Sequence, residues 1–201
     1  LLLVFFLLVS QQSFAVNWEK MLLKVNTSYE KGDYIKTEKY LTKLRKKATK
    51  KLGPENEYLV EYYMLSARNK LAQGLLADFT TNIDKAISMS QKVFSENSEK
   101  HVDYLNRASA LLIQNGDMLK AHEFAQKALE QLEKLEASDR LKALTNLNLA
   151  AVYSGMGFYA KAIAFMDENN EYFMGRAVKK ESFVDESGKL KTKRLDQAEI
   201  D

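Results

Sequence analysis

Residues 29–34 read YEKGDY, and the glycine at position 32 separates two stretches whose composition is typical of helices. Glycine inside a helix costs about 1 kcal/mol relative to alanine, so its presence here indicates a turn. The same pattern returns in LAQGLL, IQNGDM and SGMGFY, at Gly74, Gly116 and Gly157. The interval between successive glycines is nearly constant along the chain. This regularity predicts four repeated helical hairpins, each of which turns at its glycine.

The composition favours an all-α fold. The chain of 201 residues has one proline and eight glycines, few for a sheet protein, whose turns need both. Apolar residues recur at helical spacing, as Leu105, Ala108 and Leu112 do ahead of Gly116. We call the helix before each glycine A and the helix after it B. The A helices are expected at 17–31, 56–73, 98–115 and 139–155, and the B helices at 34–51, 76–94, 118–135 and 158–174.

Three of the turns carry a family resemblance. The segments KGDY at 31–34, NGDM at 115–118 and GFYAKA at 157–162 resemble the turn and B helix of a tetratricopeptide repeat (TPR). The 42-residue spacing is similar to the kinesin-light-chain-like variety of that family, over about residues 17–174. The resemblance implies a right-handed superhelical array whose neighbouring hairpins cover one another's apolar faces. Heat and armadillo arrays have a similar period, but a glycine at the A–B turn favours the TPR interpretation.

Three positions depart from the family pattern. Thr37 and Phe79 stand at the fifth position after their glycines, where the family prefers a small residue and where Ala121 and Ala162 stand in the other repeats. Asn169 replaces the alanine late in the fourth B helix. These departures concern how individual repeats pack rather than the fold.

The resemblance further implies that the A helices line the concave side of the array, where extended segments of partners dock. Counting back from each glycine by 13, 10, 6 and 3 positions then gives the side chains that face inward. The candidate partner-binding residues chosen in this way are Glu19, Leu22, Asn26, Tyr29, Glu61, Met64, Arg68, Leu71, Asp103, Asn106, Ile113 and Leu147.

An acidic column runs through these candidates. Glu19, Glu61 and Asp103 occupy the same phase in three successive repeats, and Leu144 ends the series. A row of carboxylates along a groove would favour a partner with a basic segment. The alternative is that acids in the first turns of helices only oppose the helix macrodipole. Both interpretations remain open at the level of sequence.

A basic run follows in the first B helix. Residues 36–51, KTEKYLTKLRKKATKK, hold many lysines and a single acid, Glu38. Such a run meets phosphate or an acidic membrane surface in some proteins, and forms a solvated outer face in others. The net charge of +3 for the whole chain is too small to indicate nucleic-acid binding, so no nucleic-acid partner is expected.

The first fifteen residues are interpreted as a signal peptide that lacks its front. Residues 1–9 are an apolar run, and Ser13 and Ala15 fit the small-residue rule for cleavage before Val16. A membrane anchor or a core helix are the alternatives, although the run is far shorter than the ~20 residues of a spanning helix. The chain has no cysteine, which together with export favours a bacterial periplasm or cell surface.

The helical pattern stops after Phe173. The segment SFVDESGKLKT is typical of a β-hairpin or an irregular excursion, and the final RLDQAEID resembles the opening of a further helix. We therefore divide the chain into a signal peptide at 1–15, a TPR-like domain at 16–174 and an irregular or hairpin segment at 175–201.

No recognised catalytic set, phosphate-binding loop or metal motif occurs, so we expect no enzymatic activity, no cofactor and no metal. His101 and His122 lie on different helices of one repeat, and no Asp or Glu stands at a spacing that would complete a metal site with them. His101 is expected to be an exposed first-turn residue, and His122 to lie near the turn.

These observations predict an exported, non-catalytic scaffold that binds a protein or peptide in its A-helix groove. The alternatives are a docking region of a longer enzyme or signalling protein that continues beyond residue 201, and a self-associating array.

Overall fold

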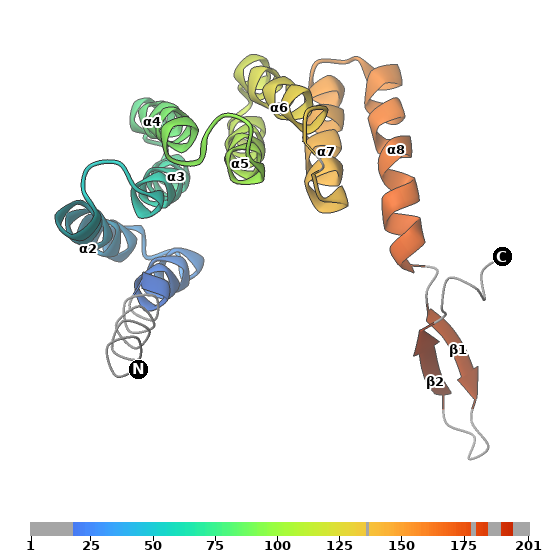
Figure 1. Ribbon diagram of the computed structural model, residues 1–201, viewed down its shortest axis with the longest axis horizontal. Helices are drawn as coiled ribbons and strands as arrows, with labels where there is room; N and C mark the ends of the chain where they lie inside the picture. Colours follow the sequence, from blue (N-terminus) through green and yellow to red (C-terminus); the bar gives the residue numbers. More distant parts are fainter. Residues whose placement is uncertain (1–17, 136, 178–179, 185–189, 195–201) are drawn as a thin grey trace, which may run out of the picture.

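The computed structural model describes residues 18–135, 137–177, 180–184 and 190–194, with side chains up to residue 169. Residues 18–30 are helical, and a row of seven further helices follows (Figure 1). They are α2 (Tyr34–Leu52), α3 (Glu57–Ala72), α4 (Leu76–Phe94), α5 (Glu99–Asn115), α6 (Met118–Leu132), α7 (Asp139–Gly155) and α8 (Tyr159–Ala177). The helical array is all-α, as the sequence predicts, and its boundaries differ from the predicted ones by a few residues at most.

A two-stranded sheet follows α8. Strand β1 (Lys180–Val184) pairs antiparallel with β2 (Leu190–Arg194), with Lys180 opposite Arg194 and Val184 opposite Leu190. Of the two predicted forms of this segment, the structure therefore has the hairpin. Helix α8 extends to Ala177, slightly beyond the predicted end of the repeats. The predicted signal peptide at 1–15 and the predicted helix opening at the end of the chain lie outside the described residues.

The four glycines turn the chain in one and the same way. All four have φ between +71° and +83°, a left-handed conformation that favours glycine. At Gly116, the glycine N–H donates to the Ile113 carbonyl, and the N–H of Asp117 donates to the Leu112 carbonyl, both at 3.0 Å. Equivalent pairs of bonds occur at the other three glycines. This is the Schellman arrangement, which satisfies the last carbonyls of each A helix.

The hairpins stand side by side in an arc (Figure 1). The A helices, which are residues 18–30, α3, α5 and α7, lie on the inner side of the arc. The B helices α2, α4, α6 and α8 lie outside. Helices α3, α5 and α7 pack against α4, α6 and α8, and α5 also contacts both α3 and α7. The helix at residues 18–30 shares a buried cluster with α2 and α3. The A helices thus form one continuous layer.

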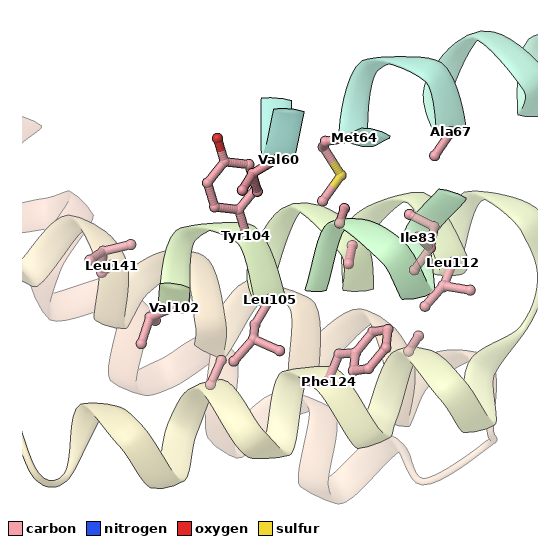
Figure 2. Close-up of a cluster of buried hydrophobic side chains, with 14 of the residues drawn as sticks. Val60, Met64, Ala67, Ile83, Val102, Tyr104, Leu105, Leu112, Phe124 and Leu141 are labelled. Atoms are coloured by element: carbon pink, nitrogen blue, oxygen red, sulfur yellow. The ribbon is translucent and has the colours of Figure 1, made fainter. Parts of the chain in front are cut away.

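A continuous core joins the second, third and fourth repeats. Figure 2 shows Val60 from α3, Ile83 from α4, Leu105 from α5 and Phe124 from α6 in one buried cluster. A separate cluster around Trp18, whose exposed fraction is 3%, fills the first repeat. Because each cluster draws on neighbouring helices, no hairpin buries its apolar face alone.

The three departures from the family pattern are accommodated inside the array. Thr37 is buried and donates to the Ser28 hydroxyl at 2.9 Å. Phe79 is fully buried in the main core. Asn169 is buried and donates its amide hydrogen to the Ala143 carbonyl at 2.9 Å. At Thr37 and Asn169, a polar side chain is accommodated in place of a small one because it forms a hydrogen bond.

The prediction that His101 is exposed is wrong. His101 retains 3% of its accessible surface, and its Nδ1 lies 2.7 Å from the Ser90 hydroxyl. Burial lowers the pKa of this imidazole, while Glu96 raises it and Lys127 lowers it further. His122 is half-buried, and its Nε2 lies 3.1 Å from the Tyr153 hydroxyl. Both histidines therefore connect helices by hydrogen bonds.

Candidate functional site: the inner surface of the A helices

The inner surface is centred on an ion pair between α3 and α5. Arg107 donates from Nη1 to Glu61 Oε2 and from Nη2 to Oε1, both at 2.8 Å. Tyr104 donates its hydroxyl hydrogen to the same Oε2 at 2.9 Å. An ion pair in which a planar guanidinium donates two hydrogen bonds to one carboxylate is stronger and better oriented than a pair with a single contact. We call these three residues the Glu61 network.

The protonation states of the Glu61 network are well defined. Burial by itself would raise the pKa of Glu61, but the hydrogen bonds and charge of Arg107, together with the Tyr104 hydroxyl, hold that pKa below its usual range. Burial and the negative charge of Glu61 raise the pKa of Tyr104. Burial would lower the pKa of Arg107, and its bonds to Glu61 raise it instead. At neutral pH, the network is thus an anion, a cation and a neutral phenol.

The acidic column is largely neutralised by Arg107. Besides Glu61, the guanidinium lies 4.0 Å from Asp103 Oδ2 on the same helix. Only Glu19 is exposed and forms no ion pair within the described part of the chain. The inner surface therefore does not present three free carboxylates, and attraction of a basic partner segment is weaker than the sequence implies.

A second fixed cation lies between the first two repeats. The Arg68 guanidinium carbon lies 3.9 Å from the centroid of the Tyr29 ring. The Tyr29 ring also contacts Tyr34 at a tilted angle of 56°. Tyr29 and Arg68 are each half-buried, so one face of this stack remains accessible. Cation–π contacts of this kind are worth about 0.5–1 kcal/mol at exposed sites.

Two predicted groove residues are not on the surface. Met64 is 2% exposed and Asn106 is 3% exposed. Met64 lies in the main core, among the side chains shown in Figure 2. Asn106 donates to the Thr145 hydroxyl at 2.8 Å and accepts from Asn148, so it connects α5 to α7. In the second and third repeats, the tenth position before the glycine is buried, and these two assignments are corrected accordingly.

The remaining candidates are partly accessible. Leu22, Asn26, Leu71, Ile113 and Leu147 are half-buried, and three of them pack against the core clusters. Between them, Ala110 on α5 and Ala151 on α7 are exposed. Because these exposed side chains are small, a partner can approach the helix backbone closely at these positions of the third and fourth repeats.

A hollow of about 420 Å³ adjoins the Glu61 network at the beginnings of α3, α5 and α7. Its walls are fixed by contacts between repeats. Lys100 pairs with Glu57 at 3.3 Å, and Glu99 accepts a hydrogen bond from the Ser138 N–H at 2.7 Å. Phe94 stacks on Tyr104, with ring centroids 5.8 Å apart. The hollow offers one aromatic wall and charges of both signs.

Sequence reasoning missed Tyr104 and Arg107. Arg107 stands one helical turn after Asp103, a spacing that places both on one helix face and is a detectable signal for an ion pair. Its main partner, Glu61, belongs to the preceding repeat, and no local pattern indicates that contact. Tyr104 follows Asp103 in the sequence, and no sequence pattern indicates that it belongs to this site.

The described residues contain no group of three or more His, Cys, Asp or Glu side chains arranged to hold a metal ion. None of the helices in the described part of the chain is long and apolar enough to cross a membrane. What the inner surface offers chemically is recognition: two oriented guanidinium groups, aromatic rings and a small-residue floor.

Comparison with solved structures supports the fold. The crystal structure of BtubC (BKLC) from P. vanneervenii matches with a TM-score of 0.53 over 79% of this chain and 80% of that chain. The fold is that of a kinesin-light-chain-like TPR array. The two sequences are 18% identical, so the likeness concerns the fold alone. Protein-family profiles and curated protein sequences give no match to this chain.

Proposed function

We propose that this TPR-like array is a non-catalytic scaffold that binds an extended segment of a protein partner along its inner surface. The segment would lie across the A helices from the Tyr29–Arg68 stack, past the Glu61 network, to the exposed Ala110 and Ala151. Concave surfaces of helical-repeat proteins are commonly used in this way. The TPR-like fold supports the scaffold role, and the inner surface supplies the binding site.

The observation that carries the proposal is the preorganisation of the two guanidinium groups. Arg68 is stacked on Tyr29, and Arg107 is held at two points by Glu61. Both side chains are ordered before a partner arrives, so binding loses little of their conformational entropy. Each retains unused N–H donors, which suit backbone carbonyls or a carboxylate of an extended segment.

The site can be tested with a library of random twelve-residue peptides displayed on phage and selected on the intact chain. Binding of the selected peptides should be lost in Ala110→Arg, which places a long side chain on the floor of the inner surface. Because Ala110 is exposed, the substitution leaves the core untouched. Thr81→Arg, at an exposed position of α4 on the outer side, is the matched control and should bind normally.

The result against the proposal is equally clear. Peptides that bind Ala110→Arg and also a Tyr29→Ala/Arg68→Ala variant as tightly as the parent chain would place the binding site elsewhere. Thermal unfolding of each variant, followed by circular dichroism, shows whether the array remains folded in these assays.

Export is a further part of the proposal, supported by the apolar run and the small residues ahead of Val16. Expression of the chain in a bacterium, behind an added initiator methionine and two lysines, should yield a periplasmic product that begins at Val16. N-terminal sequencing measures this directly. An intact leader on a cytoplasmic product would contradict it.

A further inference from the structure

The net positive charge of the first hairpin exceeds that of the whole chain. Residues 18–52 hold eleven Lys or Arg and four Asp or Glu, a net charge of +7. The whole chain has a net charge of +3, so all other residues together carry −4. Such an asymmetry between parts of one chain indicates a charged interaction partner.

The lysines gather around three open hollows on this hairpin. One hollow of about 520 Å³ lies along α2 and reaches Gln73. Two others, of about 300 Å³ and 210 Å³, lie between α2 and the helix at residues 18–30. Lys43 lines the first and second hollows, and Lys24 lines the second and third. The three hollows together form what we call the basic face.

The basic face also has apolar walls. Tyr40 lines both of the smaller hollows, with Met21 in one and Leu23 in the other. Leu23 is 64% exposed, so its apolar side chain is accessible to a partner. Each hollow has the size of one or a few side chains, so the face is suited to receive individual residues of a partner.

The lysines of the basic face lack acidic partners within the described residues. Lys24, Lys43 and Lys46 form no ion pair there. Elsewhere in the array several cations are paired, as Lys92 is with Glu55 and Lys120 is with Asp84. Mutual repulsion among unpaired lysines opposes folding slightly, and a bound anion relieves it.

Packing of the first repeat does not explain these lysines. Helix α2 buries Thr37, Leu41, Leu44 and Ala48 along one stripe. The lysines that line the hollows lie on the other faces of α2, and all but Lys47 are exposed. Other polar residues could replace these lysines without loss of core packing.

We propose that the basic face of the first hairpin is a second docking surface, for an acidic polypeptide segment whose apolar side chains enter the hollows beside Met21 and Tyr40. The lysines then pair with the carboxylates of the segment, and Leu23 becomes covered. This surface is separate from the inner surface of the A helices, so either proposal can fail without the other.

An acidic polypeptide fits better than the two other classes of anionic partner. Phosphate recognition in nucleic acids relies heavily on arginine, and the Arg45 guanidinium of α2 lies over the Tyr62 ring, 5.7 Å from its centroid. Nucleic-acid bases stack on several exposed aromatic rings, and Tyr40 alone lines the hollows. Separate hollows with apolar walls match side chains of a peptide better than a lipid surface.

The test measures fluorescence anisotropy of labelled peptides with the intact chain. The probe is the acidic peptide ELEELEELEE, and its two controls are EGEEGEEGEE, which lacks apolar side chains, and KLKKLKKLKK, which reverses the charge. The first should bind most tightly, the second more weakly, and the third not at all. Binding of the first should weaken as salt shortens the Debye length from ~10 Å at 0.1 M to ~3 Å at 1 M.

Substitutions locate the binding. Lys24→Gln with Lys43→Gln removes two cations that line two hollows each, and should weaken binding of ELEELEELEE about tenfold. Lys134→Gln with Lys142→Gln, exposed positions in the third and fourth repeats, is the matched control and should bind like the parent. Leu23→Ser should weaken binding of the Glu–Leu peptide and leave that of the Glu–Gly peptide unchanged.

Several outcomes overturn the proposal. Equal affinity of the Glu–Leu and Glu–Gly peptides removes the role of the hollows. Equal losses in the two lysine pairs make the attraction a property of net charge alone. Binding of phosphatidylserine vesicles or duplex DNA without any binding of the acidic peptide assigns the basic face to another class of partner.

Discussion

The Glu61 network should be the strongest polar coupling between two repeats, and this can be measured. A double-mutant cycle uses the parent chain, Glu61→Gln, Arg107→Met and the double variant. Two parallel hydrogen bonds of 2.8 Å join the side chains, and Tyr104 supplies a third. The side chain of Glu61 is 21% exposed and that of Arg107 is 35% exposed.

The expected magnitude follows from these exposures. Breaking a fully buried pair costs about 3–5 kcal/mol, whereas an exposed pair is worth about 0.2–1 kcal/mol. Arg107 is about one-third exposed, so solvent screens part of the attraction. We therefore expect a coupling free energy of about 2 kcal/mol, between the two limits. For a chain of this size, each kcal/mol moves the thermal midpoint by roughly 2–4 °C.

The assay is urea unfolding of the four chains at neutral pH, followed by far-ultraviolet circular dichroism. The cycle cancels effects that each substitution has by itself, including effects on the unfolded chain. Glu123 and Lys127 give a matched control within one helix, because their side chains are 54% and 52% exposed. Their coupling should be about 0.3–0.5 kcal/mol.

Acid should remove the coupling between Glu61 and Arg107 over a defined range of pH. The pKa of Glu61 is lower in the folded chain than in the unfolded one, so its stabilising contribution is complete above the unfolded value, near 4.5. It is lost as the pH falls through the lowered pKa. The reasoning fails if the coupling of Glu61 with Arg107 does not exceed that of Glu123 with Lys127 at neutral pH.

Three further perturbations have defined outcomes. Gly116→Ala should lower the free energy of unfolding by about 1–2 kcal/mol in a urea titration, because φ is +82° there, while Gly116→Asn should lose less; equal losses would contradict this. Burial lowers the pKa of His101, so below about pH 6.5 the unfolded chain binds more protons and stability falls with acid. His101→Gln should show a smaller slope of stability against pH between about 5 and 7, and an unchanged slope would exclude this role. Asn106→Ala, which removes the bonds from α5 to α7, should cost about 1–3 kcal/mol by thermal unfolding, and a neutral effect would show that the polar contact is dispensable.

Much of the fold was predictable because its signal is local. A glycine that ends a helix in a left-handed conformation leaves its mark at one position, and four such marks at a nearly constant interval define a repeat. Helical spacing of apolar residues then places each helix within a few residues. The A helices occupy the inner side, as the family resemblance implies.

The candidate site was only partly predictable, because its contacts join helices far apart in the sequence. Counting from the glycines gives the phase of a side chain around its own helix. It does not distinguish the inner surface from the contact between neighbouring A helices. For this reason it assigned Met64 and Asn106 to the surface, although both are buried. Arg107 neutralises Glu61 only because α3 and α5 stand side by side at one relative rotation.

The sequence by itself determined the repeat, the turns and the strong positive charge of the first hairpin, since each depends on residues close together along the chain. Only the tertiary structure decided which charges are paired, which histidine is buried and where lysines surround open hollows. The physical reason is that ion pairing and burial depend on distances between helices, and those distances are set by how the side chains of adjacent repeats pack.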